Sequence, residues 1–230
     1  MTDSNRRYDL VIFDLDGTLT DSHVGIARSV QHALAQFDIV VDDLDAMRPF
    51  VGPPLRDTFA GHYGFDPDQT VRAVAAYRER YGTVGLLENE MFPQTPALLQ
   101  AVADTGATLV VASTKGEPFV HRILEHFALD HFFAVMGGAS FDDAISTKAD
   151  VISRVLRDLP EVPPPDRIIM VGDREHDIEG ARELGIETIS VRFGYAAPGE
   201  LEAHAPLAIA STHDELAALL GVSLAPVAAR

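Results

Sequence analysis

Six short apolar runs restrict the fold of this chain more than any other feature of its sequence. They are rich in aliphatic residues and lie at residues 10–13, 109–112, 133–136, 168–171, 189–191 and, more weakly, 207–210. Near-continuous apolar runs are typical of parallel strands that are covered on both faces, and most of these runs are separated by segments with helical periodicity. The pattern predicts an α/β fold with a doubly wound parallel sheet.

The segment between Asp21 and Met91 departs from this alternation. It contains no convincing strand, but apolar residues recur at helical spacing at positions 24, 27, 30, 34 and 37 and again at 71, 74, 77 and 81. We therefore expect a helical domain at residues 21–91, inserted into an α/β domain that comprises residues 1–20 and 92–230.

Composition limits the classes of function. With 230 residues, of which 47% are hydrophobic, the chain is long enough to bury a sizeable core. The net charge of -17 argues against partners such as nucleic acid or an anionic membrane, since both require a basic surface. No apolar stretch is long enough to cross a bilayer, the N-terminus lacks the apolar core of a secretory signal, and there is no cysteine. These features predict a cytoplasmic protein.

Polar residues follow three of the expected strands. Asp14 and Asp16 come after the first run, Ser113-Thr114-Lys115 after the second, and Asp173 after the run that ends at Val171 and Gly172. Ligands of open α/β sheets bind outside the carboxyl ends of the strands, so these side chains should converge on one crevice.

Several carboxylates in one crevice require a cation. Magnesium is the expected ion, because it prefers oxygen ligands and commonly bridges to phosphate, whereas zinc would favour histidine or cysteine. One aspartate could then attack phosphorus and form an aspartyl phosphate. A second aspartate two residues later lies on the same side of an extended chain, where it could protonate the leaving oxygen and later deprotonate water. The spacing of Asp14 and Asp16 suits these two roles.

Four segments of the sequence resemble, in order, the four motifs of the haloacid dehalogenase (HAD) superfamily. They are DLDGTLTDS at residues 14–22, the strand that ends in Ser113, Lys148, and VGDREHD at residues 171–177. The resemblance covers nearly the whole chain, and a helical cap inserted after the first motif is typical of the phosphoglycolate phosphatase-like branch. Members of this superfamily often have proline directly after the third-motif lysine, whereas here Ala149 follows.

The resemblance implies a role for each motif residue. Asp14 would be the nucleophile and a magnesium ligand, and Asp16 the general acid/base that also lends its backbone carbonyl to the metal. Ser113, helped by Thr114, would bind the phosphoryl group, and Lys148 would neutralise its charge. The remaining implied metal residues are Asp173, as a ligand, and Asp177, which supports that end of the site.

Other charged residues have less specific interpretations. Arg56, in the turn-rich stretch 50–57, either pairs with a second anionic group of the substrate or lies on the solvated face of a helix that begins near Pro54. Lys115 is interpreted as a structural or surface residue, and His176 as an exposed loop residue.

The predicted function is the magnesium-dependent hydrolysis of a small phosphomonoester, with phosphoglycolate as a candidate, through an aspartyl phosphate. The expected partner is a small phosphorylated metabolite, and the chain is expected to be a monomer or homodimer. The alternatives are a phosphosugar mutase of the beta-phosphoglucomutase type and a nucleotidase or pyrophosphatase of the same superfamily. Asp16 argues against dehalogenation, which does not need this acid. A phosphoacceptor signalling domain would explain neither Asp16 nor the insertion.

Overall fold

The computed structural model describes residues 7–142 and 144–224, and most of the N-terminal stretch behind the cytoplasmic prediction, residues 1–6, lies outside them. The chain forms two compact units. The first unit consists of two segments, one that ends at Leu19 and one that begins at Met91. The second unit is the segment between them, Thr20–Glu90. Both junctions lie one residue before the boundaries expected from the sequence.

The first unit is built on a six-stranded parallel sheet in the order β5-β4-β1-β6-β7-β8, which confirms the predicted fold class. The strands are β1 (Leu10–Phe13), β4 (Thr108–Gly116), β5 (Val135–Ala139), β6 (Ile168–Gly172), β7 (Glu187–Val191) and β8 (Ala208–Ala210). Strand β1 lies between β4 and β6, with Phe13 beside Val111 on one side and Val171 on the other. The two strands that flank β1 therefore end near Asp14.

Strand β4 is longer than the sequence suggested. It continues beyond Ala112 to Gly116, and its register with β5 shifts between these two residues. The residues expected to follow the strand, Ser113 to Lys115, are thus part of it. This extension was not predicted because the apolar pattern stops at Ala112.

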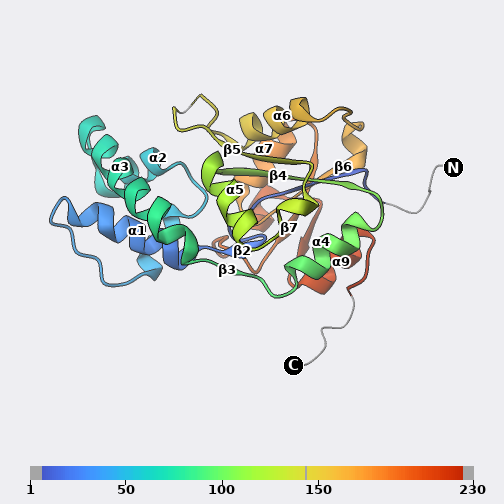
Figure 1. Ribbon diagram of the computed structural model, residues 1–230, viewed down its shortest axis with the longest axis horizontal. Coiled ribbons are helices and arrows are strands. Elements are labelled where there is room, and N and C mark those ends of the chain that lie inside the picture. Colours follow the sequence, from blue (N-terminus) through green and yellow to red (C-terminus); the bar gives the residue numbers. More distant parts are fainter. Residues whose placement is uncertain (1–6, 143, 225–230) are drawn as a thin grey trace. The chain divides into compact units, whose positions relative to one another are not determined.

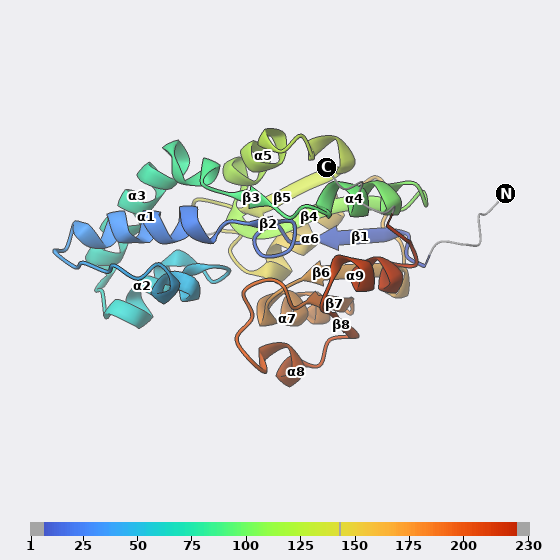
Figure 2. The same ribbon diagram turned by 90° about the horizontal axis from the view of Figure 1, so that it is seen from below.

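Helices cover both faces of the sheet. They are α4 (Thr95–Ala103), α5 (Glu117–His126), α6 (Lys148–Asp158), α7 (Glu175–Glu183), α8 (Glu200–His204) and α9 (His213–Leu220), with short 3-10 helices at Asp130–Phe132 and Pro165–Arg167. Helices α6 and α7 lie on one face, and α4 and α9 on the other (Figure 1). Helix α8 packs against α7 near the β8 edge (Figure 2).

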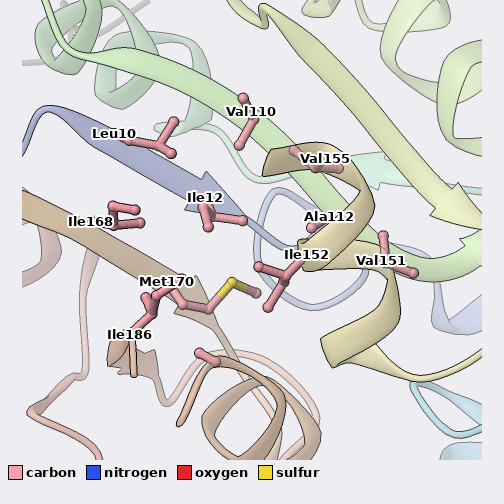
Figure 3. Packing of buried hydrophobic residues seen from close by; sticks show 11 residues of the cluster. Leu10, Ile12, Val110, Ala112, Val151, Ile152, Val155, Ile168, Met170 and Ile186 are labelled. Atoms are coloured by element: carbon pink, nitrogen blue, oxygen red, sulfur yellow. The ribbon is translucent and has the colours of Figure 1, made fainter. Parts of the chain in front are cut away.

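Helix α6 is anchored at both its start and its inner face. Val151, Ile152 and Val155 pack on aliphatic side chains of β1, β4 and β6, such as Ile12 (Figure 3). At the start of the helix, Thr147 Oγ1 accepts a hydrogen bond from the backbone N–H of Asp150 at 3.1 Å, and the Asp150 carboxylate accepts one from the backbone N–H of Thr147 at 3.2 Å. This reciprocal cap fixes the first turn of the helix and with it Lys148.

The second unit is helical. It contains α1 (His23–Ala35), α2 (Leu55–Tyr63) and α3 (Pro67–Thr83), with 3-10 helices at Asp45–Phe50 and Gly85–Leu87. Two short strands that the sequence did not suggest, β2 (Thr20–Asp21) and β3 (Glu90–Met91), pair with each other where the chain passes between the units. Within the described part of the chain, no helix combines the length and apolar character that a membrane span requires.

His213, the first residue of α9, is buried among aromatic rings. Its ring stacks on Phe193 with a centroid distance of 4.3 Å and lies 5.8 Å from that of Phe92. Its Nε2 atom is buried and has no hydrogen-bond partner among the described residues. Burial lowers the pKa of His213, and the adjacent Asp214 opposes this shift only in part.

The lowered pKa of His213 predicts a loss of stability in mild acid. The folded protein keeps this imidazole neutral at pH values where the unfolded chain already binds a proton, so its stabilising contribution is present above about pH 6.5 and is lost as the pH falls through the folded pKa. We expect the urea midpoint to fall less between pH 8 and pH 5 in His213→Phe than in the wild type. His62→Gln, at an exposed position, should follow the wild type. Equal falls in all three proteins would contradict the prediction.

Candidate active site

The carboxyl ends of three adjacent strands hold the residues expected in the crevice. Asp14 directly follows β1, and its backbone N–H donates to the carbonyl of Val171 in β6 at 2.9 Å. Ser113 is buried in the extension of β4, and Asp173 directly follows β6. The order β4-β1-β6 therefore brings together residues that are about a hundred and sixty positions apart in sequence.

Lys148 projects from the start of α6 into this group. Its Nζ atom lies 2.7 Å from Asp14 Oδ1 and 2.8 Å from Asp177 Oδ1, and it donates a hydrogen bond to the Ala112 carbonyl at 2.9 Å. The side chain is only 3% exposed. Burial by itself lowers the pKa of Lys148, but the two carboxylates outweigh it and raise the pKa above the usual lysine value. A buried ammonium ion therefore lies against Asp14.

The carboxylates of Asp14, Asp173 and Asp177 form a compact buried cluster. One oxygen from each lies within 4.8 Å of the others. Asp177 Oδ2 accepts hydrogen bonds from the backbone N–H groups of Asp173 and Arg174, both at 3.0 Å, and Asp173 Oδ2 accepts one from Tyr195 at 2.6 Å. These contacts hold the two later carboxylates in fixed orientations.

This cluster fits a hard divalent cation. Burial, followed by the negative charges of Asp177 and Asp14, raises the pKa of Asp173 well above its usual value. Burial also raises the pKa of Asp177, although Lys148 opposes it. Asp173 Oδ1 is buried and has no hydrogen-bond partner among the described residues. One ammonium ion cannot balance three carboxylates, and an ion such as magnesium would use oxygen donors of this kind.

Glycines leave the space in which these side chains sit. Gly17 has a φ of +81°, and a Cβ atom there would lie 2.2 Å from Asp173 Oδ2. A Cβ at Gly194 would lie 2.3 Å from the same oxygen. On α7, a Cβ at Gly180 would lie 2.7 Å from Lys148 Cβ and 2.9 Å from the backbone nitrogen of Ala149. The site therefore depends on the absence of side chains at these positions.

Gly180→Ala should destabilise the protein although it replaces glycine within a helix. Alanine normally favours a helix interior by about 1 kcal/mol, but here its methyl group would push the start of α6 away from α7, and overpacking of this kind costs about 1–3 kcal/mol. The matched control is Gly61→Ala in α2, where nothing lies within 4 Å of the added methyl group. Urea unfolding should show a lower free energy for Gly180→Ala and an unchanged or higher one for Gly61→Ala. An increase in both variants would contradict this account of α6 and α7.

Asp16 has a different partner. Its Oδ2 atom lies 2.7 Å from Lys115 Nζ, and the two side chains are 9% and 6% exposed. The surface interpretation of Lys115 is therefore wrong. Its signal in the sequence was its rarity, because Lys115 and Lys148 are the only lysines of the chain. The backbone N–H of Tyr195 was also missed, since no pattern in the sequence links this loop position to Asp173.

The remaining expected site residues have varied environments. Ser113 Oγ accepts a hydrogen bond from the backbone N–H of Lys115 at 3.3 Å, and Thr114 is half-buried on β4. Arg56 is the second residue of α2 and belongs to the helical unit, unlike the other expected site residues. His176 was expected in a loop, but it is the second residue of α7, and its side chain is 36% exposed.

A carboxylate held beside a buried ammonium ion at the carboxyl edge of a doubly wound sheet is suited to chemistry on a phosphoryl group. Phosphoryl-transfer enzymes that form an aspartyl phosphate need a carboxylate and positive charge side by side in this way. Comparison with known proteins identifies the family. Residues 11–191 match the model of the haloacid dehalogenase-like hydrolases, and the chain belongs to this family.

Several relatives are similar over most of their length. A protein of Pseudomonas aeruginosa named 5'-nucleotidase is 42% identical over 206 residues, which cover 90% of this chain and 92% of the relative. The Mycobacterium tuberculosis protein named tyrosine-protein kinase PtkA is 40% identical over 215 residues, covering 93% of this chain and 72% of the relative. The crystal structure of a predicted phosphatase from Clostridium acetobutylicum superimposes with a TM-score of 0.87 at 41% identity and covers 91% of this chain and 96% of that one. The predicted enzyme class is confirmed: the protein is a HAD-family phosphatase.

Proposed function

We propose that the protein hydrolyses a small phosphomonoester in a magnesium-dependent reaction, with Asp14 as the nucleophile. The observation that carries this proposal is the position of Asp14. One of its oxygens lies 2.7 Å from the Lys148 ammonium, and its carboxylate also belongs to the buried cluster with Asp173 and Asp177. Positive charge beside a nucleophilic carboxylate offsets the repulsion between that carboxylate and an approaching anionic phosphate.

The proposed reaction has two steps. In the first, an Asp14 oxygen forms a bond to phosphorus while the bond between phosphorus and the ester oxygen breaks, and Asp16 gives a proton to the departing oxygen. In the second, Asp16 takes a proton from water as the water oxygen attacks phosphorus, and Asp14 is released with free phosphate. Ser113 and Thr114 are proposed to bind the phosphoryl oxygens, and Lys148 to neutralise their charge.

Magnesium is proposed to be held by the carboxylates of Asp14 and Asp173 and the backbone carbonyl of Asp16, with Asp177 orienting the cluster. It would supply positive charge that stabilises the transferring phosphoryl group. The protein's own contribution is to fix these ligands, through the backbone N–H groups of Asp173, Arg174 and Tyr195.

The substrate is proposed to be a small metabolite rather than a polyanion, since the chain carries a net charge of -17. The similarity to the protein named 5'-nucleotidase makes nucleoside 5'-monophosphates the first group to test. The next compounds to test are those suggested by the sequence, namely phosphoglycolate, sugar phosphates and pyrophosphate. The similarity to the protein named tyrosine-protein kinase PtkA raises a second activity, transfer of phosphate to a tyrosine side chain.

A phosphate-release screen tests the proposal. Purified wild-type protein and Asp14→Asn are incubated with these esters in magnesium and, separately, in excess chelator. We expect at least one ester to be hydrolysed by the wild type alone and only when magnesium is present. Arg56→Ala on the same panel should selectively lose esters that carry a second anionic group, roughly ten- to a hundredfold, if Arg56 pairs with that group. Hydrolysis that persists in chelator, or equal rates for Asp14→Asn and wild type, would refute the proposal. Transfer of labelled phosphate from ATP to a tyrosine peptide without phosphate release would favour the kinase activity instead.

A further inference from the structure

The chain contains two lysines, and both lie in the candidate active site. Lys148 pairs with Asp14, and Lys115 pairs with Asp16. All the other long cationic side chains are arginines, which number sixteen. An arginine can serve at an exposed position, but its wide planar guanidinium is not interchangeable with a compact ammonium in a tight site. Both lysines are buried and paired with carboxylates at 2.7 Å, in sites that suit the smaller ion.

Lys115 holds one oxygen of Asp16 and leaves the other available. Its Nζ atom lies 2.7 Å from Asp16 Oδ2, whereas Asp16 Oδ1 is buried and has no hydrogen-bond partner among the described residues. A carboxylate fixed through one oxygen loses most of its rotational freedom but can still exchange a proton through the second oxygen. This arrangement matches a group that must both donate and accept a proton.

The path of β4 places Lys115 in this position. The strand pairs with β5 again at Gly116, after a shift in register between Ala112 and Gly116, so Lys115 is carried by a strand rather than by a free loop. A Cβ at Gly116 would lie 2.2 Å from the ring of Phe141, which packs directly against this part of the strand. A strand can keep a catalytic group oriented better than a mobile loop.

We propose that Lys115 is a positioning residue that orients Asp16 for proton transfer to the leaving group and from water. The inference rests on the proposed phosphatase function, and Lys115 acts only through Asp16. It makes Lys115 part of the acid/base step, whereas Lys148 belongs to the nucleophilic step.

The dependence of the rate on the leaving group tests whether Lys115 acts in the acid/base step. A simple alkyl phosphate needs a proton on its departing oxygen, whereas 2,4-dinitrophenolate leaves without one. Lys115→Met should therefore lower kcat for the alkyl ester by roughly ten- to a hundredfold, the effect of a misplaced catalytic group, and change KM little. On 2,4-dinitrophenyl phosphate the same variant should release 2,4-dinitrophenolate in a pre-steady-state burst at nearly the wild-type rate, because Asp16 is then needed only for the later attack of water. Arg157→Met, which removes one exposed positive charge on α6, is the control and should match the wild type on both esters.

A double-mutant cycle provides the sharper result. If Lys115 acts only through Asp16, adding Lys115→Met to Asp16→Asn should cost little further activity on the alkyl ester. Independent losses that multiply in the double mutant would overturn the inference, as would a burst of 2,4-dinitrophenolate that Lys115→Met slows as much as it slows kcat for the alkyl ester. Failure of the wild type on both esters would instead refute the proposed function, so the two failures are distinguishable.

NMR of protein with labelled lysines tests for the ion pair between Lys115 and Asp16 without measuring turnover. Protein labelled with ¹³C at lysine Cε should give two cross-peaks, one from each lysine, and Lys115→Met assigns them by removing one. Asp16→Asn should shift the Lys115 peak clearly more than the Lys148 peak. A Lys115 peak that does not move in Asp16→Asn would show that the pair does not form in solution and would overturn the inference.

Discussion

Asp14→Asn is expected to lower kcat/KM by a factor on the order of 10⁴ or more, the size of effect seen when a covalent nucleophile is removed. An amide is a poor nucleophile and a poor ligand for a hard cation, so the substitution removes the proposed covalent step and weakens the carboxylate cluster. The measurement is steady-state hydrolysis of the best substrate from the screen.

The fold should survive this substitution because asparagine has nearly the shape of aspartate. Lys148 keeps Asp177 and the Ala112 carbonyl as partners. Asp158→Asn, which neutralises an exposed carboxylate at the end of α6, is the matched control and should leave activity unchanged. Activity of Asp14→Asn within tenfold of the wild type would contradict the role of Asp14 as nucleophile.

Lys148→Met is expected to affect both stability and catalysis. Methionine has a similar length, so packing under α6 is largely retained, but the buried carboxylates of Asp14 and Asp177 lose their ammonium partner. Breaking a buried ion pair by removing one partner typically costs about 3–5 kcal/mol. The catalytic loss should be at least about a hundredfold, since one positively charged group that stabilises the transferring phosphoryl group is removed.

Added magnesium should distinguish the electrostatic cause from a packing defect. If uncompensated carboxylates destabilise Lys148→Met, a bound cation should raise its Tm more than that of the wild type. The packing control is Val155→Ala on the same helix, which should lose stability but gain no extra benefit from magnesium. A fall in stability of less than about 1 kcal/mol for Lys148→Met, or a magnesium effect equal to that of Val155→Ala, would contradict this account.

The sequence predicted those parts of the fold that depend on local pattern. Strand β1 was found at its observed limits because Leu10 to Phe13 are all apolar and all buried. Helices α1 and α3 lie where apolar residues recur at helical spacing. Strands β2 and β3 were missed because each has only two residues, too few for any periodic signal, and pairs with a segment about seventy residues away.

The candidate site divides in the same way. Asp14, Asp16 and Asp173 could be predicted because each follows an apolar run at the same edge of a parallel sheet. The groups that pair with these carboxylates could not be predicted from the sequence, because their positions depend on tertiary packing. Lys115 reaches Asp16 only because β4 continues past its apolar segment, and Tyr195 reaches Asp173 from a loop 22 residues later.

Trapping the intermediate tests the central claim most directly. Wild-type protein in magnesium is mixed with excess substrate, quenched in acid and reduced with borohydride, which converts an acyl phosphate but not a free carboxylate to an alcohol. Trypsin should release Tyr8–Arg28, the peptide that contains both Asp14 and Asp16. Mass spectrometry is expected to find homoserine at position 14 and unchanged aspartate at position 16, and no reduction in Asp14→Asn or in chelator. Homoserine at position 16, a phosphate on another side chain, or phosphate release with no trapped residue would contradict an aspartyl phosphate on Asp14.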